Sequence, residues 1–328
     1  MQEQAFKILS TKLPGGDFGK ACFGQDVQLE MRRRVQQSMT RRTILAILVI
    51  TAFIAAAAAQ SPAKPGMHDD RGVTSYVEFG GTSDADGQAY ELNSNVGYDF
   101  SQHFGIAVGA PFYFVSPSST TGGTSTSGVG NPYLSLHLKY PGPALNFSTA
   151  LTGSAPLGDS KKGLSTGRAT FDWTNHFDHA FSDLTLFAEV GIANTIADTR
   201  LFVRPYTTLG FNTHFQGGAS YDVWKSFSVG ASGYDILPSG QQTVFSRVTK
   251  GQGNTGTAHH GRVFENNQQT TGSASIAQDD GFSAWIDANP GRSVDLELGF
   301  TRSMVYDLNS VAFSIGINLG QLYRRSPK

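Results

Sequence analysis

Apolar and polar side chains alternate along much of the chain with the two-residue period of a β-strand. In residues 311–320, five large apolar side chains share one face, whereas only small or polar side chains such as Ser314 occupy the other. The same alternation recurs, with every charge on one face, in residues 104–114, 134–140 and 294–300. The pattern predicts strands with one apolar face and one small or polar face.

With weaker segments included, the alternation predicts about twelve antiparallel strands. Two of these segments are long, 206–221 and 227–248, and a slip of phase between Ala231 and Tyr234 predicts a β-bulge in the second. The connections alternate in length: short turns such as 141–144 follow one strand, and longer loops such as 195–205 and 238–274 follow the next. An up-and-down meander of strands is predicted.

Alternation alone does not separate a membrane barrel from a soluble sandwich, because both have two-faced strands. The uncharged apolar faces and the alternating loop lengths favour an outer-membrane β-barrel of about twelve strands, with short periplasmic turns and longer extracellular loops. Aromatic side chains near predicted strand ends suit the two membrane interfaces. They are Tyr98, Phe104, Phe114, Tyr140, Phe171, Trp173, Trp224 and Trp285.

One apolar run, 44–59, has the layout of a signal peptide: Arg41 and Arg42 precede it and alanines end it. At 16 residues the run is shorter than the roughly 20 that a membrane-spanning helix needs, although an anchoring helix is the alternative. The predicted organisation is therefore an upstream extension or mis-annotated segment (1–38), a signal peptide (39–59) cleaved near Ala59, a periplasmic segment (60–72), the barrel (73–320) and a basic tail (321–328).

The composition restricts the chemistry that the exported chain can perform. Its single cysteine, Cys22, lies before the predicted cleavage site, so the exported chain has no disulfide, thiol nucleophile or lipoprotein anchor. No stripe of Lys and Arg follows the pattern that phosphate binding needs, which argues against nucleic acid as a partner. We expect no cofactor and no metal. The expected partners are outer-membrane lipid, small-molecule solutes and, during biogenesis, the barrel assembly machinery.

If the apolar faces meet lipid, the opposite faces line the lumen. Acidic residues outnumber Lys on these faces, and an acidic lining favours cations or neutral polar solutes over anions. The alternative is that these residues pair across a filled interior and only hold the wall together. The candidates are Glu78, Glu91, Asn93, His137, Lys139, Asn146, Asp172, His176, Glu189, Asn212, His214, Asp295 and Glu297.

Two motifs carry a family resemblance. Residues 128–134 (GVGNPYL) lead into His137-Leu138-Lys139-Tyr140, and a loop at 155–159 (APLGD) follows. Together they resemble the outer-membrane barrels associated with the MetA pathway of phenol degradation, which have a Gly-rich GxGD start to a strand and a PTGD loop. Asn131 stands here for the Asp. The resemblance implies passage of small, often hydrophobic or aromatic compounds, and it implies no catalytic residues.

Other classes of function remain open at this stage. An outer-membrane hydrolase needs a Ser and a His together on the barrel exterior, and the sequence has no signature for such a pair. The densest titratable cluster, His176 to His179, falls at a predicted turn and is interpreted as solvated. The third class is a structural or receptor barrel acting through the 238–274 loop, which could instead fold inward and constrict the pore. His259 and His260 in that loop are interpreted as flexible surface.

Overall fold

The computed structural model describes residues 72–85, 87–118, 124–248, 268–291 and 293–319. The predicted upstream segment, signal peptide and basic tail lie outside the described residues, as do His259 and His260 and nearly all of the segment 60–72. No helix within the described ranges is both long and apolar enough to cross a membrane.

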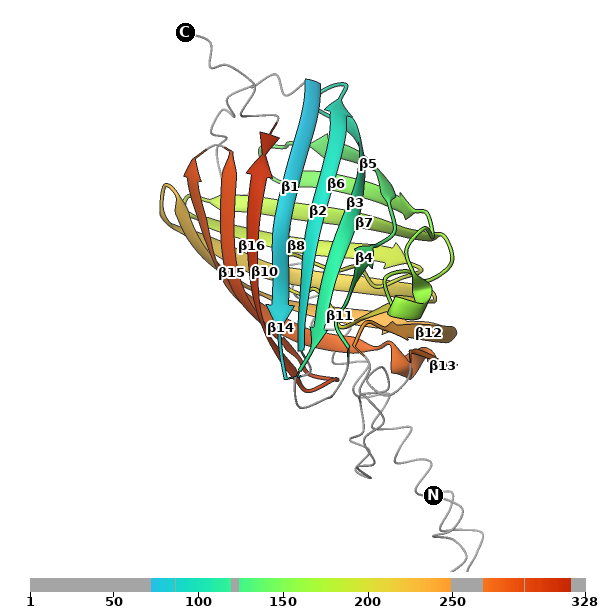
Figure 1. The fold of residues 1–328 in the computed structure, drawn as a ribbon. Helices are drawn as coiled ribbons and strands as arrows, with labels where there is room; N and C mark the ends of the chain where they lie inside the picture. The colour runs from blue at the N-terminus through green and yellow to red at the C-terminus, as the bar shows by residue number, and fades with distance from the viewer. Residues whose placement is uncertain (1–71, 86, 119–123, 249–267, 292, 320–328) are drawn as a thin grey trace, which may run out of the picture. The chain divides into compact units, whose positions relative to one another are not determined.

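The described residues form a closed antiparallel β-barrel of twelve strands (Figure 1). The first strand pairs with the second and also with the last, so that Tyr76 lies opposite Asn318 and the sheet has no free edge. This confirms the predicted all-β fold. The strands are β1 (Gly72–Ser83), β2 (Gly87–Asp99), β3 (Phe104–Pro117), β5 (Tyr133–Tyr140), β6 (Asn146–Ser154), β7 (Thr170–Phe181), β8 (Leu184–Ala193), β10 (Asn212–Trp224), β11 (Phe227–Pro238), β14 (Asp279–Gly291), β15 (Val294–Ser303) and β16 (Leu308–Asn318).

Smaller elements lie in the long connections. The strand β4 (Thr126–Val129) extends the pairing of β3. A separate antiparallel sheet contains β9 (Tyr206–Leu209), β12 (Gln241–Ser246) and β13 (Gln269–Ser273). Two 3-10 helices, η1 (Ser160–Lys162) and η3 (Ala274–Ile276), complete the described elements.

The two long predicted strands are each divided. The segment 206–221 becomes β9 and β10, with Gly210 at φ +151° between them, and 227–248 becomes β11 and β12, with Gly240 at φ +70°. A positive φ is readily adopted only by glycine, so both divisions fall at residues that permit the change in backbone conformation. The first part of one predicted segment (β9) and the last part of the other (β12) therefore belong to the small sheet rather than lengthening the wall.

The connections alternate in length, as the sequence predicts, through the middle of the chain but not at its two ends. Tight turns join β2 to β3, β5 to β6, β7 to β8, β10 to β11 and β14 to β15. At the other end, long connections join β3 to β5, β6 to β7, β8 to β10 and β11 to β14, whereas β1 to β2 (84–86) and β15 to β16 (304–307) are short. The start of β1 and the end of β16 lie at the same end of the barrel as the tight turns (Figure 1). We call this the short-turn end and the opposite one the long-loop end.

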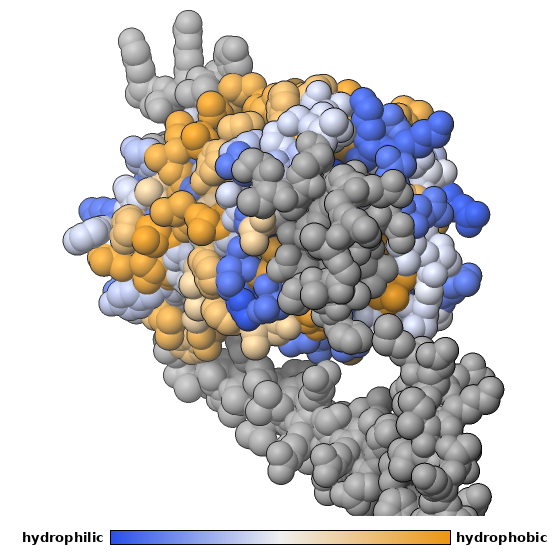
Figure 2. Space-filling view, turned by 60° about the horizontal axis from the view of Figure 1, so that its bottom comes forward, coloured by the Kyte–Doolittle hydropathy of each residue, from blue (hydrophilic) through white to orange (hydrophobic). Residues whose placement is uncertain are grey.

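The outer face of the wall is apolar. In β16 the large residues Val311 and Ile315 are 54% and 42% exposed, whereas Ala312 and Ser314 between them are buried. Figure 2 shows apolar residues gathered on the wall beside more polar regions. A belt of this kind is typical of a surface that contacts lipid. Other large outward residues that are exposed are Val96, Val108, Leu134, Leu151, Phe215, Ile286 and Leu298.

Two predictions about side-chain direction are wrong. Strand β11 pairs in unbroken register through residues 231–234, so there is no bulge at that point; Tyr234 and Ile236 turn inward instead, and Ile236 is buried in an apolar cluster. The prediction that Trp285 lies at the membrane interface is the second, because Trp285 lines an internal cavity. In both cases the inside of the barrel contains apolar groups, so an apolar side chain does not by itself mark the outer face.

Candidate functional site: an inward segment and the chamber beside it

Residues 194–205, between β8 and β9, fold into the barrel; we call them the inward segment. Its backbone is bonded to strands on two parts of the wall. Thr82 Oγ1 of β1 donates to the Val203 carbonyl at 2.6 Å, and Thr301 Oγ1 of β15 donates to the Leu201 carbonyl at 3.1 Å. A side chain at Gly299 would overlap Leu201, so this glycine leaves room for the segment to approach β15.

Arg200 of the inward segment pairs with three groups on the barrel wall. Its Nε lies 2.9 Å from Glu78 Oε1 and 3.5 Å from Glu297 Oε2, and its Nη2 donates to Tyr76 OH at 3.1 Å. Burial opposes the charge of Arg200, but Glu78 and Glu297 outweigh it and hold the pKa of the guanidinium above its ordinary value. Arg200 therefore stays charged and joins the segment to two barrel strands.

Asp198 forms a second attachment. Its Oδ2 accepts from Arg247 Nη1 at 2.8 Å and from Tyr113 OH at 2.9 Å, and its Oδ1 accepts from the Arg204 N–H at 2.9 Å. The Arg247 guanidinium also lies over the Tyr113 ring, 4.3 Å from its centroid, and its side chain is only 4% exposed. This arrangement ties the inward segment to β3 and to the residues that follow β12.

Apolar packing fills the space around these polar attachments. Ile196 and Phe202 of the inward segment are buried in one cluster with inward residues of β11 and β16. Val203 is buried in a second cluster with Tyr113 and Val115 of β3 and with Leu164 and Val248 from the long connections. Because the segment packs against both groups of strands, it occupies the interior at the long-loop end. Whether the 238–274 loop also folds inward is not tested, since residues 249–267 lie outside the described residues; of its described part, Val244 and Val248 belong to these two clusters and Arg247 bonds to Asp198.

A chamber of about 590 Å³ lies between the inward segment and the wall formed by β7, β8, β10, β11, β14 and β15. Its lining combines carboxylates with aromatic rings. Carboxylates come from Asp172, Glu189, Asp287 and Glu297, and rings come from Phe187, Phe202, Tyr234 and Trp285. The mixture differs from the outer belt, where the large side chains are apolar.

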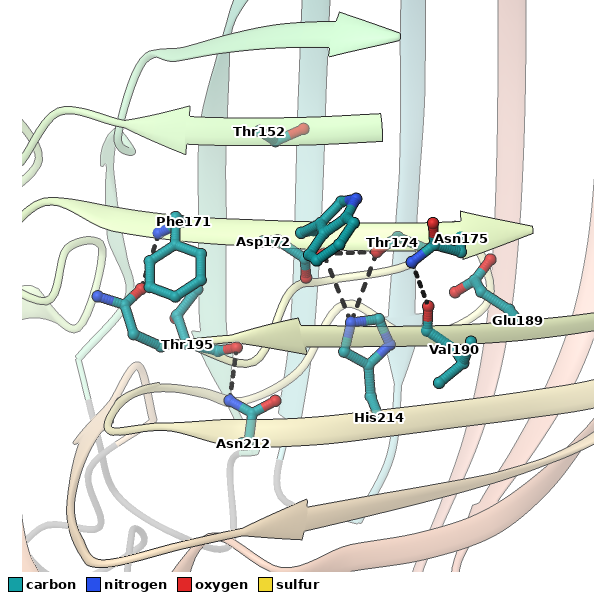
Figure 3. Close-up of polar contacts among 12 residues, drawn as sticks. Thr152, Phe171, Asp172, Thr174, Asn175, Glu189, Val190, Thr195, Asn212 and His214 are labelled. Atoms are coloured by element: carbon teal, nitrogen blue, oxygen red, sulfur yellow. Dashed lines mark hydrogen bonds and ion pairs between the residues drawn. The ribbon is translucent and has the colours of Figure 1, made fainter. Parts of the chain in front are cut away.

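On one side of the chamber, Asp172, Thr174 and His214 point toward one another (Figure 3). His214 Nε2 is 3.4 Å from Asp172 Oδ1 and 3.5 Å from Thr174 Oγ1, so both groups share one ring nitrogen. A nucleophile, base and orienting group in series would use both ring nitrogens, so this arrangement does not match a catalytic triad. Gly191 makes room for the ring, because a Cβ there would overlap His214 Nε2.

The strand register places the predicted lumen residues on the inner face of the sheet. Several of them meet in pairs: Glu78 and Glu297 at Arg200, His214 with Asp172, and His176 Nδ1 with Glu189 Oε2 at 3.6 Å.

Other predicted lumen residues bond to inner residues outside the predicted set. Asn93 accepts from Tyr133, His137 contacts Asp99, Asn146 donates to Asp178, Asn212 donates to the Thr195 carbonyl and Asp295 accepts from Tyr76. Glu91 and Lys139 share this face by register. That these residues line a conduit stays a prediction.

The cluster at His176 to His179 does not lie in a turn. Strand β7 continues to Phe181, and the reversal falls at Ser182 and Asp183. His176 and Asp178 therefore face inward, opposite Glu189 and Phe187 of β8, whereas His179 pairs with Leu186 on the other face. Among the described residues, no group of three or more His, Cys, Asp or Glu side chains is arranged to hold a metal ion.

Sequence reasoning missed the inward segment and the inner position of Trp285. A signal for the first was present: Leu201, Phe202 and Val203 are consecutive apolar residues inside a predicted loop. Such a run is costly in water, which indicates that the loop is buried against something. The two motifs of the family resemblance do meet, since the Gly158 N–H donates to Asn131 Oδ1 at 3.2 Å.

No family model matches the sequence, and no curated protein matches it. Among solved structures, the fold is similar to an outer-membrane channel from Pseudomonas putida F1, with 13% identity and a TM-score of 0.48 over 78% of this chain and 99% of that one. It is also similar to the NanC porin (7%, 0.42, over 74% and 98%) and to the KdgM porin (5%, 0.44, over 74% and 98%). At these values the likeness assigns no function to this chain.

Proposed function

We propose that this chain is an outer-membrane channel for small solutes. The observation that carries the proposal is a closed barrel with an apolar outer belt and a polar interior that contains a chamber of about 590 Å³. A closed sheet pairs its backbone groups within itself, as a lipid environment requires. Its apolar outer belt suits lipid, and its polar inner face suits water and solutes.

The inward segment limits the size of the solute. It is packed into two apolar clusters and held by ion pairs at the long-loop end, so we expect a narrow passage rather than a wide pore. The inner rings of Phe187 and Trp285 support passage of partly apolar solutes, in agreement with the compounds that the family resemblance implies.

Solute flux into vesicles tests this proposal. The refolded chain is reconstituted in liposomes, and swelling is measured with neutral solutes of increasing size. We expect entry of solutes the size of a pentose or smaller and exclusion of oligosaccharides, because the chamber volume is close to that of ligand pockets for single small molecules. Folded protein is recognised by its altered mobility on unheated gels. Folded protein that passes none of these solutes would contradict the proposal.

A further prediction concerns charge selectivity. Carboxylates of Glu189 and Asp287 line the chamber, whereas Arg200 is neutralised by two glutamates. Fixed negative charge in a narrow passage favours cations. In a KCl gradient across a planar bilayer, we expect a reversal potential of the sign that K⁺ permeation gives. The double variant Glu189→Gln with Asp287→Asn should move this potential toward zero. A potential of the opposite sign in the unmodified protein would show that the charge assignment is wrong.

A further inference from the structure

An aromatic surface lies on the inner wall of the chamber. The rings of Phe187 and Trp285 have centroids 6.2 Å apart, and the His176 ring stacks on Phe187 with centroids 5.9 Å apart and planes at 19°. The strands between β8 and β14 carry glycine at the paired positions: Gly218 opposite Phe187 and Gly230 opposite Trp285. Large rings therefore lean across two strands that have no side chain at those positions.

Gly230 shows how closely the indole lies against the wall. A Cβ at Gly230 would fall 2.3 Å from Cζ2 of Trp285 and 2.4 Å from Cε2, so the ring rests over the β11 backbone. One face of the ring is taken up by this contact, and the residue lines the chamber. The glycine and the tryptophan together form a fixed aromatic surface, and the tryptophan face is the strongest of the aromatic faces in attracting a cation.

Carboxylates flank this surface on the same inner face. Asp287 follows Trp285 by two residues, and Glu189 follows Phe187 by two residues. Oδ1 of Asp287 is shielded from solvent and has no hydrogen-bond partner among the described residues, whereas its Oδ2 accepts from Asn289. A shielded carboxylate oxygen without a donor is costly, and a positive charge in the chamber would stabilise this carboxylate through space.

The arginines near the chamber are engaged with other groups. Arg200 is paired with Glu78 and Glu297. The Arg204 guanidinium donates to the Ala197 carbonyl and lies 4.7 Å from the ring centroid of Phe202. Among the described residues, neither arginine forms an ion pair with Asp287 or Glu189. Glu189 is contacted by His176 at 3.6 Å, so Asp287 is the carboxylate beside the aromatic surface that these cationic groups leave uncompensated.

We propose that the chamber binds a small organic cation, an amine or quaternary ammonium group, on Trp285 beside Asp287. This inference rests on the proposed channel and names a solute class for it. The ring face attracts a positive charge without hydrogen bonds, and the nearby Asp287 carboxylate favours a cation over an anion. A quaternary ammonium fits because it has an apolar surface and a positive charge but no donor that must be satisfied.

Equilibrium binding of choline tests the proposal, with 3,3-dimethylbutan-1-ol as a neutral molecule of the same shape. Titration calorimetry uses the refolded full chain in a non-ionic maltoside detergent, because phosphocholine detergents carry the probe's own head group. We expect choline to bind at least about tenfold more tightly than the alcohol, as a desolvated cation–π contact provides. Equal affinity for the two molecules, or no binding of choline, would overturn the proposal.

Matched variants locate the site. Trp285→Ala and Asp287→Asn should each weaken choline binding by about tenfold. Trp173→Ala, at a tryptophan that is 46% exposed on the outer face, and Asp183→Asn, at an exposed turn residue, should leave it unchanged. If Trp285→Ala does not fold, Trp285→Phe is used and should weaken binding less strongly. Choline binding that survives both chamber variants overturns the site.

The outcomes separate this inference from the proposed function. Choline binding at Trp285 in a protein that passes no ion or solute would contradict the channel and leave the binding site in place. A conducting protein that does not prefer choline to the alcohol would contradict the binding site and leave the channel in place.

Discussion

Replacing Leu298 by Arg should destabilise the folded barrel in lipid by about 2–4 kcal/mol. Leu298 lies near the middle of β15, is 54% exposed, and has Ile286 and Phe313 as its neighbours on the adjacent strands. If this face contacts the hydrocarbon core, the guanidinium must lose its hydration or distort the bilayer around it. The strand itself tolerates Arg, so the cost measures the environment of the outer face.

The measurement is a urea titration of the chain refolded in phosphatidylcholine vesicles, monitored by mobility on unheated gels. Leu157→Arg is the matched control: Leu157 is 76% exposed and lies in the connection between β6 and β7, outside the wall. We expect the control to change the free energy of unfolding by less than about 0.5 kcal/mol. If Leu298→Arg costs no more than Leu157→Arg, the outer face does not contact lipid.

Replacing Arg200 by Gln should loosen the inward segment and increase conductance. The substitution leaves Glu78 and Glu297 without their cation, and the Glu297 side chain is only 9% exposed. Arg200 itself is 41% exposed, so solvent screening reduces the loss to about 1–3 kcal/mol of local stability. Since 1.4 kcal/mol is a factor of ten, the population in which the segment is detached should rise by about tenfold or more.

Amide hydrogen exchange measures this detachment directly. The Arg204 amide, bonded to Asp198, and the Ile196 amide, bonded to Thr208, should exchange faster in Arg200→Gln, and single-channel conductance should be higher. The matched control is Arg302→Gln, which removes an arginine from a pair with the 79% exposed Asp307. A pair of this kind contributes at most about 1 kcal/mol. If the two variants behave alike, Arg200 does not hold the segment.

The wall of the barrel could be predicted from the sequence because its pattern is local. Alternation fixes which residues share a face, and closure of the sheet then makes one face outer and the other inner. In β16, the assignment of Val311 and Ile315 to the outer face and of Ala312 and Ser314 to the inner face needs only this local information. The longest connections, such as those from β8 to β10 and from β11 to β14, likewise follow from the spacing of the strands.

The interior could not be predicted in the same way, because its contents depend on contacts between distant residues. Arg200 meets Glu78 and Glu297 across more than ninety positions of sequence on either side, and no local pattern encodes that meeting. Once the inward segment fills the long-loop end, inner positions near it become apolar. Tyr234 and Ile236 lie on the inner face of β11, whereas the apolar residues before them lie on the outer face. This change of face looks like a slip of phase in the sequence, and it led to the wrong prediction of a bulge.

Trp285 illustrates the same limit. Interfacial tryptophans are common in barrels, so its type suggested the outer face. Its register with Gly230 and Gly299 places it on the inner face, and Gly230 leaves the space for its ring. The glycines were visible in the sequence, but their partner becomes known only with the strand register.

Single-channel recording of the refolded chain in planar bilayers tests the central claim, that this closed barrel conducts small solutes past an inward segment. We predict discrete, cation-selective current steps that are small in the unmodified protein and larger in Arg200→Gln. Folded, gel-shifted protein that gives no current steps in either form, and no solute flux in liposomes, would contradict the account.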